Sequence, residues 1–99
     1  MDNIEELAEL FKAISDVTRL RLIKLLAENR KPLCVNALSN KLGVSQSAVS
    51  QHLRILRQAG LVSGERCGYY VHYSLDADRL AQCEKLFQKT FAKGKRKSG

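Results

Sequence analysis

The sequence predicts a small, mainly α-helical domain with one β-hairpin, built from about five helices and a two-stranded wing. Three observations point to this fold class. A chain of 99 residues is long enough for one domain but not for two. Apolar residues recur at helical spacing through most of the chain, and residues 61–75 change to the period of two that is typical of strands. Hydrophobic residues make up 44% and charged residues 27%, as in ordinary globular proteins.

The first thirty residues predict two amphipathic helices. The apolar stripe of the first helix is expected at Ile4, Leu7, Phe11 and Ile14. Ser15 or Asp16 then offers an N-cap for the second helix. The buried stripe of the second helix is expected at Val17, Leu20, Ile23, Leu26 and Ala27. Residues 29–32 include the single proline and end the pattern.

A short helix, a tight turn and a longer helix follow. The short helix is expected over residues 33–42, and Gly43 is a suitable residue to end it. Ser45 is the predicted N-cap of the longer helix, which runs to Gln58 and is ended by Gly60. The inward face of this helix consists of Ala48, Val49, Leu53 and Leu56. Its outward face is polar or basic and contains no acidic residue; it consists of Gln46, Ser47, Ser50, Gln51 and Arg54.

The C-terminal third predicts a hairpin and a last helix. Leu61 and Val62 open a short strand, residues 65–68 are expected to form the turn, and residues 69–75 form the second strand. Asp76 is the predicted N-cap of the last helix. The apolar stripe of this helix is expected at Leu80, Cys83, Phe87 and Phe91. The domain is therefore expected to span residues 1–92, with residues 93–99 as a basic, disordered tail.

Charge and composition narrow the classes of function. The formal net charge is +7, and residues 31–75 carry five basic side chains against one acidic one, as a surface that approaches phosphates requires. No apolar run reaches the roughly 18 residues of a membrane span, and the acidic N-terminus is unlike a signal peptide. We therefore expect a cytoplasmic protein whose three cysteines are thiols. No catalytic pairing or phosphate-binding glycine loop is present, so we expect no enzyme activity.

The order of elements predicts a winged helix-turn-helix that binds double-stranded DNA. Glutamine side chains pair with adenine edges, serines donate or accept, and arginine reaches guanine or phosphate. On the wing, Arg66 is expected to probe phosphate or the minor groove, with Tyr70 beside it. The alternative, a solvated amphipathic helix, would normally mix Glu with Lys, and this face has neither. The predicted DNA-binding residues are Ser45, Gln46, Ser47, Ser50, Gln51, Arg54, Arg66 and Tyr70.

Three segments carry a resemblance to a known family. LGVSQSAVSQHLRILRQAGLV (residues 42–62), GYYVHYSL (residues 68–75) and DVTRLRLIKLL (residues 16–26) closely resemble the ArsR/SmtB family of small dimeric repressors. The resemblance covers about residues 4–90. It implies a homodimer, joined through the first and last helices, that represses transcription from an imperfect inverted repeat and is released by an inducer. The DNA contacts of the family carry over to Gln46, Ser47, Ser50 and Gln51.

The inducer is the open question, because two family metal sites are incomplete here. A Cys-Val-Cys site at the start of the short helix is matched by Cys34, but Asn36 replaces its second cysteine. The second family site consists of Asp and His residues on the last helix. In this sequence that helix has Asp76 and Asp78 near its start but no histidine. The thiols that remain are those of Cys34, Cys67 and Cys83. They offer thiolate ligands for As(III), Sb(III) or another soft ion, or a disulfide or polysulfide switch.

Each thiol also has a structural interpretation. Cys83 lies on an apolar stripe and fits a small buried hydrophobe, Cys67 fits an incidental wing residue, and for Cys34 both roles stay open. The leading hypothesis is a repressor with a thiol-based trigger. The alternatives are a winged-helix repressor without metal or redox sensing, and an architectural or protein-interaction module that does not read sequence. Preference for one operator over random duplex distinguishes the last from the others.

Overall fold

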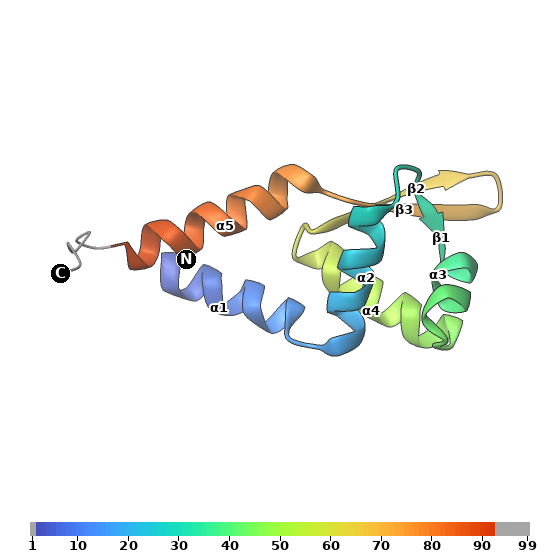
Figure 1. Ribbon diagram of the computed structural model, residues 1–99, viewed down its shortest axis with the longest axis horizontal. Helices are drawn as coiled ribbons and strands as arrows, with labels where there is room; N and C mark the ends of the chain where they lie inside the picture. Colours follow the sequence, from blue (N-terminus) through green and yellow to red (C-terminus); the bar gives the residue numbers. More distant parts are fainter. Residues whose placement is uncertain (1, 93–99) are drawn as a thin grey trace.

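A computed structural model describes residues 2–92, which form five helices and a three-stranded antiparallel sheet (Figure 1). The elements are α1 (Asn3–Ile14), α2 (Val17–Glu28), β1 (Leu33–Cys34), α3 (Val35–Leu42), α4 (Gln46–Gln58), β2 (Val62–Cys67), β3 (Tyr70–Leu75) and α5 (Ala77–Phe91). This confirms the predicted mainly α-helical class with a hairpin wing. The predicted basic tail, residues 93–99, lies outside the described residues.

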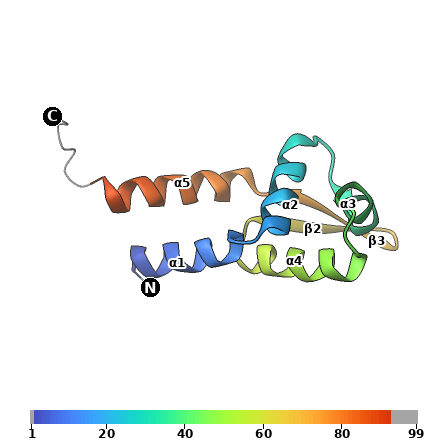
Figure 2. The same cartoon turned by 60° about the horizontal axis from the view of Figure 1, so that its bottom comes forward.

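One hydrophobic core holds the helix-turn-helix and the sheet together. It lies between α2, α3, α4 and the sheet, and α1 and α5 run alongside each other away from it (Figures 1 and 2). The core consists of Leu22, Leu26, Leu38, Val49, Leu53, Leu56, Leu61 and Val62. The described part is elongated as a result, with extents of 54 × 27 × 22 Å. None of its helices is long and apolar enough to cross a lipid bilayer.

Side-chain caps fix where the helices begin. Asp16, rather than Ser15, caps α2 by accepting a hydrogen bond from the Arg19 backbone N–H at 3.0 Å. Asp76 caps α5 in the same way, as the sequence predicted. Asp2 and Glu5 form a reciprocal capping box at the start of α1. That box was missed in the sequence, although the spacing Asp-x-x-Glu signals it.

The predicted buried stripe of the second helix is partly wrong. In α2 the buried side chains are Leu22 and Leu26, whereas Val17 is 63% exposed and Leu20 50% exposed. Ala27 is exposed as well. Leucine and isoleucine occur on more than one side of α2, so periodicity alone does not select the face that packs against the core. In α1 the buried residues are Leu7, Leu10 and Ala13, and Ile4 and Phe11 of the predicted stripe are exposed.

The sheet differs from the prediction in two places. Residues 33–34 are extended and pair with β3 (Leu33 with Tyr73, Cys34 with His72), so the helix begins at Val35 and the sheet has three strands. The turn expected at residues 65–68 is also wrong: β2 continues to Cys67, and the connection is the pair 68–69. Gly68 has φ +68, a left-handed conformation that glycine adopts without steric cost. The polar residues 65–67 suggested a turn, but a hairpin that projects into solvent is polar on both faces.

Candidate nucleic-acid interface

The turn between α3 and α4 sets the direction of α4. Gly43 ends α3 at φ +67, and its N–H donates to the Ser39 carbonyl at 2.8 Å. Ser45 then caps α4 by accepting from the Ala48 N–H at 3.1 Å. The inward face of α4 is anchored by Val49, Leu53 and Leu56, each at most 1% exposed. The opposite face of α4 is therefore held rigidly toward solvent.

All eight predicted DNA-binding residues lie at the surface. Six of them belong to α4 and its N-cap, and two belong to the hairpin. In both views the hairpin tip and the N-terminal end of α4 point toward the same end of the molecule (Figures 1 and 2). The structure does not bring Arg66 and Tyr70 to one face, however. Arg66 pairs with Val71 and Tyr70 with Cys67, so the two side chains project from opposite faces of the hairpin.

The two glutamines on the outward face of α4 differ in their surroundings. Gln46 donates its Nε2 hydrogen to the Asn36 side chain in α3 at 3.0 Å. Gln51 is exposed and makes no side-chain hydrogen bond with the rest of residues 2–92. Gln46 is thus partly pre-ordered, whereas Gln51 has its whole amide available for a ligand. The Asn36 contact was missed in the sequence because its two partners are ten residues apart.

A cluster of three polar side chains lies between α4 and the start of α2. His52 Nδ1 is 3.1 Å from Arg19 Nη1 and 3.8 Å from Asp16 Oδ2. The hydrogen bond from the Arg19 backbone N–H is the main cause that lowers the pKa of Asp16. Desolvation opposes it, and attraction to His52 and to the Arg19 charge adds to the lowering. No local sequence pattern indicates this contact, because His52 and Arg19 are 33 residues apart.

The three thiols lie on three separate elements. Cys34 is half-buried at the N-cap of α3, Cys67 is exposed at the end of β2, and Cys83 is half-buried in α5, where burial raises the pKa of its thiol. Across residues 2–92, no three or more His, Cys, Asp or Glu side chains gather into a group that could hold a metal ion. Within residues 2–92 the three thiolates are therefore not assembled into the set of donors that As(III) or Sb(III) requires.

A helix-turn-helix with an exposed, acid-free second helix and a hairpin wing defines a winged helix-turn-helix DNA-binding protein. The family model described as "Bacterial regulatory protein, arsR family" matches residues 16–63. The chain belongs to this family. It is a DNA-binding transcriptional repressor of the ArsR/SmtB type and not an enzyme.

Two curated relatives illustrate the similarity. An uncharacterized HTH-type transcriptional regulator of Methanocaldococcus jannaschii is 41% identical, over 87% of this chain and 96% of its own length. The arsenical resistance operon repressor of Escherichia coli is 37% identical, over 84% of this chain and 70% of its own length.

Solved structures share the fold over nearly the whole chain. An ArsR-like transcriptional regulator from Rhodococcus superposes with a TM-score of 0.81 at 29% identity, covering 94% of this chain and 86% of the other. The homodimeric winged helix-turn-helix domain of a possible ArsR-family regulator from Mycobacterium bovis gives a TM-score of 0.72 at 26% identity, with 88% and 79% covered.

Proposed function

We propose that the protein is a homodimeric repressor that reads an imperfect inverted repeat with α4 in the major groove and the hairpin against the neighbouring backbone. We further propose that it leaves this operator when an inducer acts through the Cys34 thiol. The observation that carries the DNA-reading role is the outward face of α4. It is exposed, free of acidic residues, and fixed from behind by fully buried side chains.

Each side chain on that face has a chemical role in the proposal. Gln51 offers a donor and an acceptor to the N6 and N7 edge of adenine. Gln46 retains its amide oxygen and one hydrogen for a base after donating to Asn36. Ser47 and Ser50 are short-armed contacts to bases or phosphates, and Arg54 reaches guanine or the backbone. Arg66 on the hairpin contributes sequence-independent attraction to phosphate.

Dimerisation through α1 and α5 is supported by the apolar surface that these helices leave exposed. Phe11 of α1 and Phe87 of α5 are 43% and 47% exposed, and their ring centroids lie 5.8 Å apart. Phe91 extends this row at 5.2 Å from Phe87 and is 59% exposed, and Ile4 is 57% exposed. No residue of α5 is buried within the described chain. A second copy is the proposed cover, and the similar domain from Mycobacterium bovis is described as homodimeric.

The position of Cys34 supports its role as the trigger. It is the N-cap of α3 without a side-chain cap hydrogen bond, and α3 is joined to the reading helix by the bond from Gln46 to Asn36. A chemical change at this thiol thus occurs two residues from Asn36, which contacts Gln46 of α4 directly. Cys83 is a weaker candidate because burial raises the pKa of its thiol and disfavours the reactive thiolate. The relative from Escherichia coli is named for arsenical resistance, so arsenite is one agent to test.

Fluorescence anisotropy on duplex DNA from upstream of the gene tests both the reading of an operator and the release by an inducer. We expect the reduced protein to bind this duplex at least about 10³-fold more tightly than random duplex. The complex is then challenged separately with arsenite, Cd²⁺, Zn²⁺ and a polysulfide donor. Equal affinity for both duplexes would contradict sequence reading and favour an architectural module.

Cysteine variants separate the trigger from DNA binding. We expect Cys34→Ser to keep the wild-type affinity for the operator and to lose release by the agent that acts on the wild type. Cys67→Ser is the matched control and should still be released. Release that persists in the Cys34→Ser protein contradicts the assignment of Cys34, and release that persists when all three cysteines are replaced contradicts a thiol trigger.

A further inference from the structure

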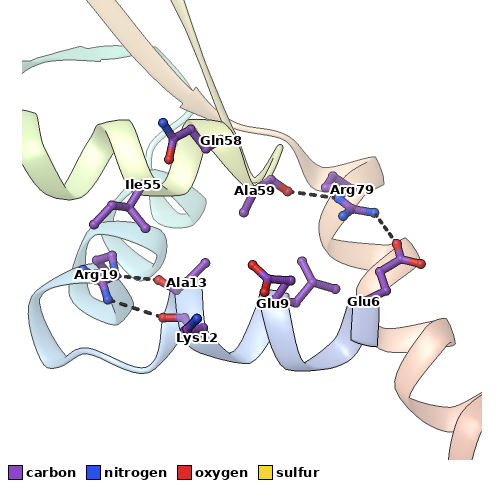
Figure 3. Close-up of a pocket in the computed structure, with 10 residues that line it drawn as sticks. Glu6, Glu9, Lys12, Ala13, Arg19, Ile55, Gln58, Ala59 and Arg79 are labelled. Carbon is purple, nitrogen blue, oxygen red and sulfur yellow. Dashed lines mark hydrogen bonds and ion pairs between the residues drawn. The ribbon is translucent and has the colours of Figure 1, made fainter. Parts of the chain in front are cut away.

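A cavity of about 590 Å³ lies between the helix α4 and the helix α1 (Figure 3). Its apolar lining includes Leu10 and Ala13 of α1, which are buried, and Ile55 of α4. An arginine lies at each end of the cavity: Arg19 from α2 at one end and Arg79 from α5 at the other. Polar bridges at the two ends of the cavity thus add to the apolar contacts between α1 and α4.

The Arg19 bridge joins three helices. Its Nε donates to the Ala13 carbonyl, and its Nη2 donates to the Lys12 carbonyl at 3.4 Å, both in the last turn of α1. Its Nη1 lies 3.1 Å from His52 Nδ1 in α4. Because a guanidinium only donates, Nδ1 must accept, which places the ring hydrogen on Nε2. The guanidinium therefore links the end of α1, where a cation is favoured by the helix dipole, to the middle of α4.

The Arg79 bridge holds the other end of the reading helix. Its Nε donates at 3.2 Å to the carbonyl of Ala59, the residue that ends α4, and its Nη1 lies 3.6 Å from Glu6 Oε2 in α1. A Cβ at position 60 would stand 3.3 Å from Arg79 Nε, so Gly60 leaves the room in which the guanidinium lies. Arg79 thus connects the C-terminal end of α4 to both α5 and α1.

We propose that Arg19 and Arg79 are positioning residues that fix the angle of α4 relative to α1 and α5. This proposal rests on the proposed function, in which α1 and α5 form the dimer and α4 reads the operator. Two reading helices must enter successive major grooves about 34 Å apart, so a change in this angle spoils the match to the operator. Attraction to phosphates does not depend on the angle. Loss of a bridge should therefore reduce operator affinity far more than affinity for random duplex.

The first test measures the ratio of operator to random-duplex affinity. We expect Arg19→Gln and Arg79→Gln each to lower this ratio at least about fivefold, with wild-type circular dichroism. Arg21→Gln is the matched control for the lost charge, because Arg21 is exposed on α2 and makes no side-chain hydrogen bond or ion pair within residues 2–92. It should leave the ratio unchanged. Lysine variants of Arg19 and Arg79 keep the charge and should show the same loss if a glutamine variant fails to fold.

Histidine variants test the Arg19 bridge by rescue. His52→Leu removes the atom that accepts from Arg19 Nη1 and should lower the ratio as Arg19→Gln does. His52→Gln supplies an amide oxygen as acceptor and should keep the ratio near the wild-type value. Equal ratios in His52→Leu and the wild type would contradict a role for this hydrogen bond.

The second test measures the helix angle without DNA. Residual dipolar couplings of backbone amides give the orientation of α1 relative to α4 in the wild type and in Arg19→Gln/Arg79→Gln. We expect the relative orientation to change, or to average over a wider range, while each helix stays intact. An unchanged angle in the double variant would overturn the positioning role. A wild-type protein that does not prefer its operator would instead overturn the proposed function, and the couplings would still decide the role of the two arginines.

Discussion

Gln51 and Gln46 differ in one contact, which decides how much of each side chain's hydrogen-bonding capacity is left for a base. Both were predicted to read bases, and both are exposed on α4. Gln46 is held by Asn36 at 3.0 Å, so part of its hydrogen-bonding capacity is used inside the protein. Gln51 has no such partner in the described chain. Its amide oxygen and its amide NH₂ group are therefore both available to one base edge. It is therefore the residue from which we expect the sharpest effect on base specificity.

Gln51→Ala should cost about 1–3 kcal/mol of binding free energy on the native operator, and this penalty should vanish on duplexes changed at the one base pair that Gln51 contacts. Arg66→Ala should weaken binding to all sequences alike and make the salt dependence of binding less steep. Anisotropy titrations on a set of single-base-pair substitutions, at two or more salt concentrations, measure both effects. A uniform loss for Gln51→Ala would remove it from base reading.

Local patterns predicted which residues of α4 are exposed, but not their partners. The reading face was predictable because period and polarity together define the outward side of a helix. The partners were not, because Asn36, Arg19 and Arg79 reach α4 from other elements. Such contacts depend on how helices cross, which spacing within one segment does not specify. The same holds for the thiols, whose separation follows from the placement of three elements.

At the scale of elements, the prediction succeeded where the signal is local. The N-caps Ser45 and Asp76 begin α4 and α5 as expected, since a cap is set by its own side chain and the next few residues. Strand β1 was missed because a strand of two residues exists only through pairing with β3, nearly forty residues later. The buried face of α2 was misjudged because the choice between Leu20 and Leu22 depends on where the rest of the core lies.

The exposure of Leu20 on α2 leads to a prediction about the free energy of unfolding. Leu53 of α4 is 1% exposed in the core, and Leu53→Ala should lower the free energy of unfolding by about 2–5 kcal/mol. Leu20, predicted to be buried, is 50% exposed, and Leu20→Ala should change the free energy of unfolding by at most about 0.5 kcal/mol. Urea titrations at one protein concentration compare the two. Equal losses would mean that Leu20 packs in the core after all.

At the scale of the whole molecule, the charge and shape divide the chain into two functional ends. The acidic side chains near the N-terminus are carried by α1, while α3 and α4 have none. The acidic residues of α1 thus lie away from the proposed DNA-binding face of α4. This distribution fits the proposal that the protein approaches phosphate at one end and a second copy of itself at the other. The two arginine bridges lie where these ends join (Figure 3).

Phe87→Glu should convert the protein to monomers, because it places a charge in the middle of the exposed aromatic row of Phe11, Phe87 and Phe91. Light scattering after size-exclusion chromatography measures the mass in solution. Tyr69→Glu is the control: Tyr69 is 95% exposed at the hairpin turn, away from α1 and α5, and its variant should remain a dimer. Since a monomer engages only one half of an inverted repeat, Phe87→Glu should also lose about 10²-fold or more in operator affinity. A Phe87→Glu protein that stays dimeric and binds its operator like the wild type would place the dimer interface elsewhere on the chain.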